Sequence, residues 1–115
     1  MRDGIVLSVR AEAGLLLDPD AAVPIALIVA ETIANAIEHG LAGRERGAIE
    51  VALVRHEAGL RLEVCDDGHG LPEGFDLATS GSLGLGIVRT FAEQLGGTFE
   101  MLPGERTTAR LTLPG

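Results

Sequence analysis

Four short polar and glycine-containing segments, in a fixed order along the chain, limit the possible folds more than any bulk property. They are Glu31–His39, Asp66–Gly70, Ser82–Gly86 and Thr107–Thr108. The first lies in an apolar helical pattern, the second directly follows an apolar strand pattern, and the third opens a second helical pattern. Each segment alone is a weak signal. Because this order rarely arises by chance, we interpret the segments as parts of one pocket between a helix, a strand end and a glycine-rich turn.

The alternation and periodicity of apolar residues predict the elements that carry these segments. We expect strands over 5–10, 15–17, 48–56, 60–65, 98–102 and 107–113, and helices over 22–40 and 84–95. Asp20 is the expected cap of the first helix, Pro24 lies in its first turn, and Gly40 ends it. This order of elements implies one α/β domain over 1–115. We expect a two-layer α/β sandwich whose mixed, mainly antiparallel sheet is covered by helices on one face.

Composition and charge argue against several classes of protein. The net charge of −8 and the scatter of the basic residues argue against nucleic acid as a partner. All 9 basic residues are arginine, so no lysine can clamp a phosphate. We expect no membrane contact, because no apolar run approaches the ~20 residues of a membrane helix. The single cysteine, Cys65, cannot form an internal disulfide, so we expect it to pack in the core of a cytoplasmic protein.

Three polar side chains lie at regular spacing within the first predicted helix. Glu31, Asn35 and His39 recur every four residues and therefore share one helical face. A solvent-facing polar stripe is the simpler interpretation. However, Ala34 and Ile37 flank the stripe, and asparagine is a poor helix former. These features favour a stripe that lies beneath a ligand.

Asp66 ends an apolar strand and is followed by glycine at two alternate positions, Gly68 and Gly70. A carboxylate at a buried strand end is costly unless it accepts hydrogen bonds. The glycines allow positive φ and a close backbone approach to a flat ligand. The alternative is an ordinary Asp-Gly turn after a strand. Further along, Ser82-Leu83-Gly84 opens the second helix, where unpaired N–H groups and the helix dipole favour anions.

Taken together, the four segments resemble the ATP-binding domain, known as the Bergerat fold, of sensor histidine kinases, DNA gyrase, the MutL repair proteins and the large heat-shock chaperone. The resemblance extends over essentially the whole chain. Residues 82–85 (SLGL) and 93–97 (EQLGG) are closest to the HWE-like branch of the sensor histidine kinases. The resemblance implies ATP and Mg²⁺ as ligands and transfer of the γ-phosphate to a histidine.

The resemblance also implies a role for each residue of the four segments. Asn35 would coordinate Mg²⁺ through its side-chain oxygen, and Glu31 would position or activate the attacking group. Asp66 would accept a hydrogen bond from the adenine amino group, assisted by Thr107 or Thr108 and an ordered water. The other ligand-binding positions are His39, Ser82, Leu83 and Gly84 near the phosphates and Gly68 and Gly70 near the base, with Gly86 serving close helix packing.

Two features of the chain leave alternatives open. Glu38 places an acid where this branch usually has a basic residue, and residues 35–39 (NAIEH) also resemble the anti-sigma serine kinases. A serine kinase of that type, or a regulatory module whose nucleotide gates a protein contact, is therefore the alternative. The glycine-rich loop over 70–82 would be a lid over the nucleotide. The resemblance implies that the phosphoacceptor histidine lies on a separate domain or chain, with a response regulator downstream.

Overall fold

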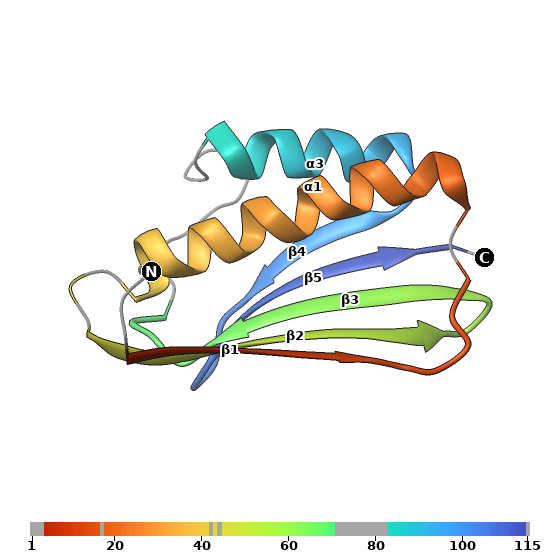
Figure 1. Cartoon of the computed structure of the whole chain (residues 1–115). Helices are drawn as coiled ribbons and strands as arrows, with labels where there is room; N and C mark the ends of the chain where they lie inside the picture. The colour runs from red at the N-terminus through yellow and green to blue at the C-terminus, as the bar shows by residue number, and fades with distance from the viewer. Residues whose placement is uncertain (1–3, 17, 42, 44, 71–82, 115) are drawn as a thin grey trace.

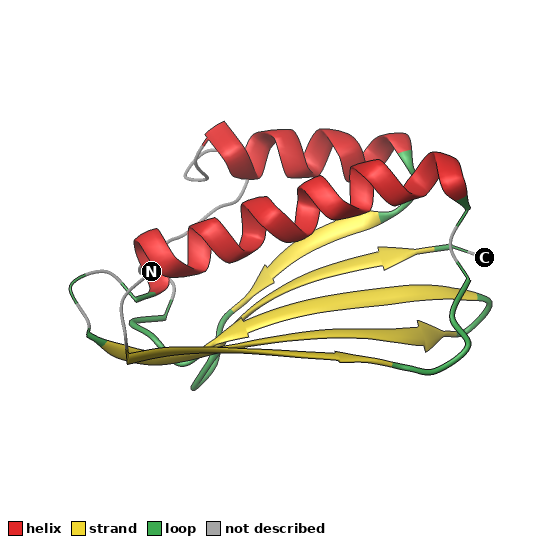
Figure 2. Cartoon of the chain, viewed as in Figure 1, coloured by secondary structure: helices red, strands yellow, loops and turns green. Residues whose placement is uncertain are grey.

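Two helices lie on one face of a five-stranded sheet (Figure 1). The computed structural model describes residues 4–16, 18–41, 43, 45–70 and 83–114. In chain order the elements are β1 (Gly4–Ala11), α1 (Pro19–Asn35), the π-helical turn η1 (Ala36–Gly40), β2 (Arg46–His56), β3 (Gly59–Asp66), α3 (Leu83–Gln94), β4 (Thr98–Leu102) and β5 (Thr107–Leu113). Figure 2 shows the two layers, which confirm the predicted α/β sandwich.

The sheet is mixed and mainly antiparallel, with the strand order β1-β2-β3-β5-β4. Among the described strands, β1 and β2 run parallel and the other neighbours run antiparallel. The predicted hairpins β2–β3 and β4–β5 are confirmed, and β4 and β5 have the predicted bounds. Because β3 pairs with β5, Asp66 lies opposite Thr107. Two of the four segments therefore meet at one end of the sheet.

The core lies between the helices and the inner face of the sheet. Every second residue of β5 is buried, because side chains alternate between the two faces of a strand. Ile28 of α1 is fully buried in the same cluster as Leu62, Val64 and Leu111. The edge strand β1 is covered much less. The apolar pattern therefore fixes which strand faces lie under the helices.

The first helix begins earlier than predicted. Its cap is Asp18, whose side chain accepts a hydrogen bond from the backbone N–H of Asp20 at 2.8 Å. Pro19 follows at the start of the helix, where its missing N–H would have no intrahelical partner in any case. The prediction that Asp20 is the cap is therefore wrong by two residues. Pro24 consequently lies inside the helix rather than in its first turn.

The second helix ends at paired glycines, as predicted. Gly96 has a φ of +74°, and its N–H donates to the carbonyl of Glu93 at 3.0 Å. The N–H of Gly97 donates to the carbonyl of Ala92 at 2.9 Å. These two bonds form a Schellman motif, in which glycine is favoured at the left-handed position.

The segment between β1 and α1 differs from the prediction. Residues 15–16 are not a strand, so the expected strand over 15–17 is wrong for the residues described. Gly14 has a φ of +80°, which turns the chain at the end of β1. Asp18 then caps α1 almost at once. Leu15 and Leu16 therefore belong to a connection rather than to the sheet.

The helix from Pro19 to Gly40 is long and apolar enough to cross a membrane by length and composition, with 22 residues and a mean hydropathy of 1.6. This qualifies the expectation that no such run exists in the chain. In this fold the helix packs on the sheet through Ile25, Ile28 and Thr32. A core helix passes the same test, so the test assigns no membrane contact.

Truncation of the core side chain beneath α1 tests this packing. Ile28→Ala should lower the free energy of unfolding by about 2–5 kcal/mol, because the fully buried side chain leaves a cavity. Val23→Ala is the matched control on the same helix, where the side chain is 67% exposed and the change should stay within about 0.5 kcal/mol. Urea unfolding measures both. Equal losses for the two variants would contradict the observed helix orientation.

Candidate functional site

A small hollow lies between the helices and the end of the sheet at which β3 stops and β5 starts. Its volume is about 10 Å³, roughly the space for a single water molecule. The lining residues are Thr32, Asn35, Ala36, Val64, Asp66, Leu85, Met101, Thr107 and Ala109. Three predicted site residues, far apart in sequence, therefore line one hollow: Asn35, Asp66 and Thr107.

Asp66 is a buried carboxylate on the inner face of the sheet, with only 4% of its surface exposed. Its Oδ1 accepts a hydrogen bond from the backbone N–H of Gly68 at 2.9 Å. A buried carboxylate needs such donors, because burial removes its hydration. The hydrogen bond also fixes the orientation of the carboxylate. Asp66 therefore lines the hollow with a hydrogen-bond acceptor whose orientation is fixed.

The sequence does not decide whether Thr107 or Thr108 assists Asp66, and the structure distinguishes between the two. Thr107 is 6% exposed and lines the hollow, and its Oγ1 is buried without a hydrogen-bond partner in the described part of the chain. Thr108 lies on the opposite face of the sheet, where its Oγ1 is 3.2 Å from Sγ of Cys65. Thr107 is thus the threonine beside Asp66. Cys65, half-buried on that outer face, is not the core residue expected.

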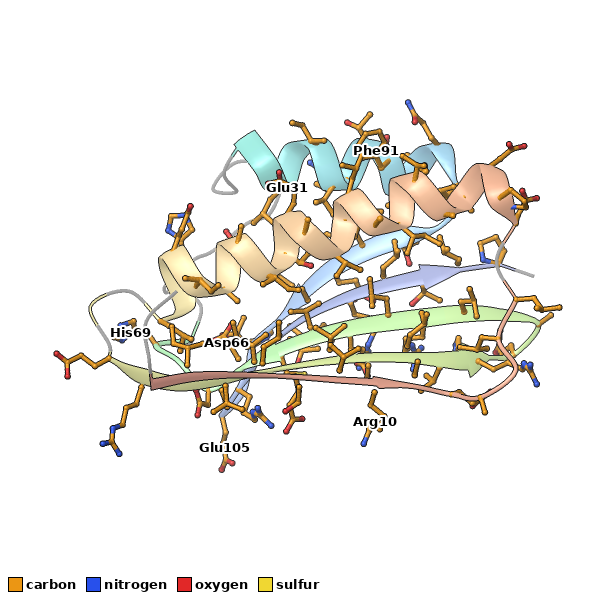
Figure 3. The ribbon with its side chains drawn as sticks, in the orientation of Figure 1. Arg10, Glu31, Asp66, His69, Phe91 and Glu105 are labelled. Atoms are coloured by element: carbon orange, nitrogen blue, oxygen red, sulfur yellow. The ribbon has the colours of Figure 1, made fainter. Side chains whose placement is uncertain are left out.

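The polar stripe of the first helix is only partly preserved. Asn35 ends α1 and is half-buried, whereas Glu31 and His39 are exposed. Figure 3 shows Glu31 in the helical layer, above the sheet that carries Asp66. Between Asn35 and His39 the hydrogen bonding changes from the α-helical to the π-helical pattern, in which the turn is wider. His39 is therefore turned off the line through Glu31 and Asn35.

The glycines after Asp66 serve different purposes. Gly70 has a φ of +80°, as its predicted role requires. Gly68 is not among the glycines with positive φ, and a Cβ there would overlap the carbonyl oxygen of Gly40. Of the two properties that the sequence suggests for Gly68, positive φ is therefore not used, whereas a close backbone approach is, although to Gly40. Gly68 is needed because the loop after β3 packs directly on the end of η1.

The glycine-rich segment lies at the start of the second helix, as predicted. Leu83 is the first residue of α3, and Gly84 lies in its first turn, where backbone N–H groups lack intrahelical partners. Ser82 and the rest of the predicted lid over 70–82, apart from Gly70, lie outside the described residues. A Cβ at Gly86 would meet no described atom within 4 Å. Close helix packing is therefore not the reason for this glycine.

A metal site built mainly from protein side chains is not found in the described ranges, which contain no group of three His, Cys, Asp or Glu placed to hold a metal ion. Mg²⁺ commonly keeps several waters and takes one or two protein oxygens together with substrate phosphates. Asn35 lines the hollow and has a side-chain oxygen, a ligand type that suits this kind of site. The residues present are therefore compatible with Mg²⁺ bound together with a phosphate ligand.

Comparison with known proteins agrees with this geometry. Residues 20–115 match the family described as histidine kinase-, DNA gyrase B- and HSP90-like ATPase. Sensor histidine kinase PdtaS of Mycolicibacterium smegmatis is 39% identical over 103 residues, which cover 86% of this chain and 21% of that protein. Blue-light-activated histidine kinase 2 of Erythrobacter litoralis is 36% identical over 81 residues, which cover 70% of this chain and 23% of that protein. The chain thus spans about a fifth of these relatives.

Solved structures show the same fold. The blue-light activated histidine kinase EL346 of Erythrobacter litoralis superposes with a TM-score of 0.89 at 30% identity, over 98% of this chain and 36% of that chain. The catalytic domain of histidine kinase ThkA superposes with a TM-score of 0.75 over 96% of this chain and 78% of that chain. The ThkA match has 22% identity and carries information on the fold alone.

The hydroxyl of Thr107 leads to a stability prediction. Thr107→Val should change the free energy of unfolding by less than about 1 kcal/mol, because the hydroxyl makes no hydrogen bond to another residue in the described part of the chain. Thr108→Val is the control and should change stability by less than about 1 kcal/mol, since it loses only a weak contact with Cys65. Thermal and urea unfolding measure both. A clear loss of stability in Thr107→Val would show that the hydroxyl is satisfied.

Proposed function

Because the chain belongs to the family of histidine kinase-, DNA gyrase B- and HSP90-like ATPases, we propose that it is the ATP–Mg²⁺-binding catalytic domain of a sensor histidine kinase. It would transfer the γ-phosphate of ATP to a histidine on a separate domain or chain. The observation that carries this proposal is the convergence of Asn35, Asp66 and Thr107 on one hollow. The sensor histidine kinases among its relatives support the choice within the family.

The adenine end of the site would be built on the buried carboxylate. Asp66 accepts from Gly68 through Oδ1, and a carboxylate has acceptor capacity for further donors. The exocyclic amino group of adenine is such a donor. The hydroxyl of Thr107 lines the same water-sized hollow, where an ordered water would link it to the base and to Asp66. This arrangement selects a base with an amino group at that position.

The phosphate end would use backbone N–H groups and a metal ion. The first turn of α3, with Leu83 and Gly84, offers donors and the positive end of a helix dipole. Bound Mg²⁺ would neutralise developing charge on the phosphates, with the side-chain oxygen of Asn35 as its protein ligand. His39 would contact the phosphates and Glu31 would orient the attacking group. Phosphoryl transfer demands mainly such positioning and neutralisation.

The described histidines offer no evident acceptor for the phosphate. His39 lies within the π-helical turn, on the same helix as the site. His56 ends β2, and its Nε2 lies 3.0 Å from a guanidinium nitrogen of Arg61. His69 is tied through its backbone N–H to the carbonyl of Gly40 at 2.8 Å. The acceptor histidine is therefore proposed to come from another domain or chain in the cytoplasm, with a response regulator as the next partner.

Substitution of Asp66 tests the adenine assignment. Asp66→Asn should weaken ATP binding by about 1.5–3 kcal/mol, roughly 10- to 100-fold. The asparagine oxygen can keep the hydrogen bond to the Gly68 N–H. The asparagine NH₂ group then faces the adenine amino group, and two donors cannot form a hydrogen bond. Thr107→Val should also weaken ATP binding, whereas Thr108→Val, on the other face, should not. Calorimetric titration measures all three. Equal affinity of the wild type for ATP and GTP would remove Asp66 from this role.

Labelling in trans tests the transfer reaction. The chain alone should bind ATP–Mg²⁺ and remain unlabelled by γ-labelled ATP. Acid-labile label should appear when a histidine-bearing helical hairpin from a related sensor histidine kinase is added. Asn35→Ala should abolish this transfer because it removes the proposed protein ligand of Mg²⁺.

Three other outcomes would contradict the labelling prediction. Label on the chain alone would show that one of its own histidines is a competent acceptor. Acid-stable label on serine of an added protein would favour the anti-sigma type of kinase. Transfer by Asn35→Ala at the wild-type rate would remove Asn35 from the metal site.

A further inference from the structure

We propose that Gly40 is a positioning residue for Asp66: the missing side chain at position 40 sets the place of the carboxylate that would read adenine. This inference rests on the proposed function, because it concerns the geometry of the adenine-binding end. Gly40 is the last residue of η1 and lies outside the hollow formed by Asn35, Asp66 and Thr107. It would act through Asp66 and not by touching the ligand.

The Cα of Gly40 lies against the whole carboxylate of Asp66. A Cβ built on Gly40 would lie 2.6 Å from Oδ1 and 2.8 Å from both Cγ and Oδ2. Ordinary carbon contacts are about 3.5–4.0 Å, so even a methyl group would force the carboxylate to move. The carboxylate has little freedom to do so, because Oδ1 is already bound to the N–H of Gly68. A methyl group at position 40 would therefore displace the acceptor from the hollow.

The backbone of Gly40 is held in the same cluster. Its carbonyl oxygen accepts a hydrogen bond from the N–H of His69 at 2.8 Å. The same carbonyl lies where a Cβ of Gly68 would be, so the loop after β3 folds closely around the end of η1. Neither backbone can retreat without losing a hydrogen bond. The contact between Gly40 and Asp66 is thus enforced from both sides.

Conformational freedom does not explain this glycine. A helix-ending glycine usually has a left-handed conformation. Gly40 is not among the glycines with positive φ, and the turn closes through a π-helical bond from the N–H of Leu41 to the carbonyl of Ala36 at 2.9 Å. Alanine could therefore adopt the backbone conformation of Gly40. The remaining reason for glycine is the space occupied by the Asp66 carboxylate.

Comparison of ATP with inosine triphosphate provides the test, because hypoxanthine carries a carbonyl in place of the adenine amino group. Both nucleotides are titrated with Mg²⁺ into the wild-type chain and into Gly40→Ala. The wild type should prefer ATP by about 10- to 100-fold, the effect of one charge-assisted hydrogen bond. Gly40→Ala should lose most of this preference. Its affinity for inosine triphosphate should stay within about twofold of the wild type, because the phosphate end is untouched.

Two variants separate positioning from general destabilisation. Gly97→Ala is the matched control at the far end of the sheet, where a Cβ would overlap the carbonyl oxygen of Thr112 and lie 2.6 Å from Cδ2 of Leu113. It should lower the melting temperature and leave the ratio of ATP to inosine triphosphate affinity unchanged. Gly40→Ala combined with Asp66→Ala should recover stability lost in Gly40→Ala, because the carboxylate that clashes is gone.

The outcomes distinguish the two proposals. If the wild type shows no preference for ATP, the adenine role of Asp66 and with it the proposed function fail. If the wild type prefers ATP and folded Gly40→Ala keeps the same preference, the positioning role of Gly40 is overturned. Should Gly40→Ala fail to fold, folding of the double variant Gly40→Ala with Asp66→Ala tests whether position 40 contacts Asp66. Restored folding supports the contact with Asp66, and a double variant no more stable than Gly40→Ala overturns it.

Discussion

The carboxylate of Asp66 is the constraint around which one end of this domain is arranged. A buried carboxylate is unfavourable unless hydrogen bonds replace its lost hydration. The structure supplies the Gly68 N–H, and it brings the backbone of Gly40 against the carboxylate with no side chain between them. Glycine at position 40 is therefore a consequence of the acid, whereas glycine at position 68 is required by the nearby carbonyl of Gly40. The end of the first helix, the loop after β3 and the start of β5 all adjust to this one group.

The inner face of the sheet is apolar along its middle and polar at the end that carries Asp66. Along the middle of the sheet, the inner face carries apolar residues such as Val64 and Leu111 beneath Ile28. At the site the inner face carries Asp66 opposite Thr107 instead. A buried carboxylate and a buried hydroxyl contribute less to folding than apolar side chains would at the same positions, as is typical of positions kept for function. The apolar remainder of the sheet allows the fold to tolerate them.

The fold could be predicted from the sequence largely because its signals are local. Alternating apolar residues set the bounds of β4 and β5, and the glycine pair set the end of α3. The sequence alone does not decide the cap of α1, because Asp18 and Asp20 are both good caps and Pro19 favours Asp18 only once its position in the helix is known. Leu15 and Leu16 resemble the start of a strand because an apolar run does not reveal whether a sheet edge is available.

Within the site, the sequence identifies several of the residues but not how they are arranged in space. Asn35 and Asp66 could be placed together from their motifs, but the choice of Thr107 over Thr108 depends on the register between β3 and β5. A shift of one residue would exchange the faces of the two threonines. The contact of Gly40 with Asp66 arises only when distant segments meet, and the regular spacing of the polar residues does not reveal the change from α to π geometry before His39. Spacing within one segment carries no information about them.

The acidic charge of the chain bears on how it could bind a nucleotide phosphate. The chain has a net charge of −8, contains no lysine, and places Glu38 in η1, directly after the helix that carries Asn35. Glu38 is exposed, and at a wet surface its repulsion of a phosphate 4 Å away amounts to about 1 kcal/mol. Backbone N–H groups at the start of α3 and a bound metal ion would offset such a cost. Affinity would then depend on Mg²⁺ at the phosphate end and selectivity on the rigid carboxylate at the other, so the two properties reside in different parts of one site.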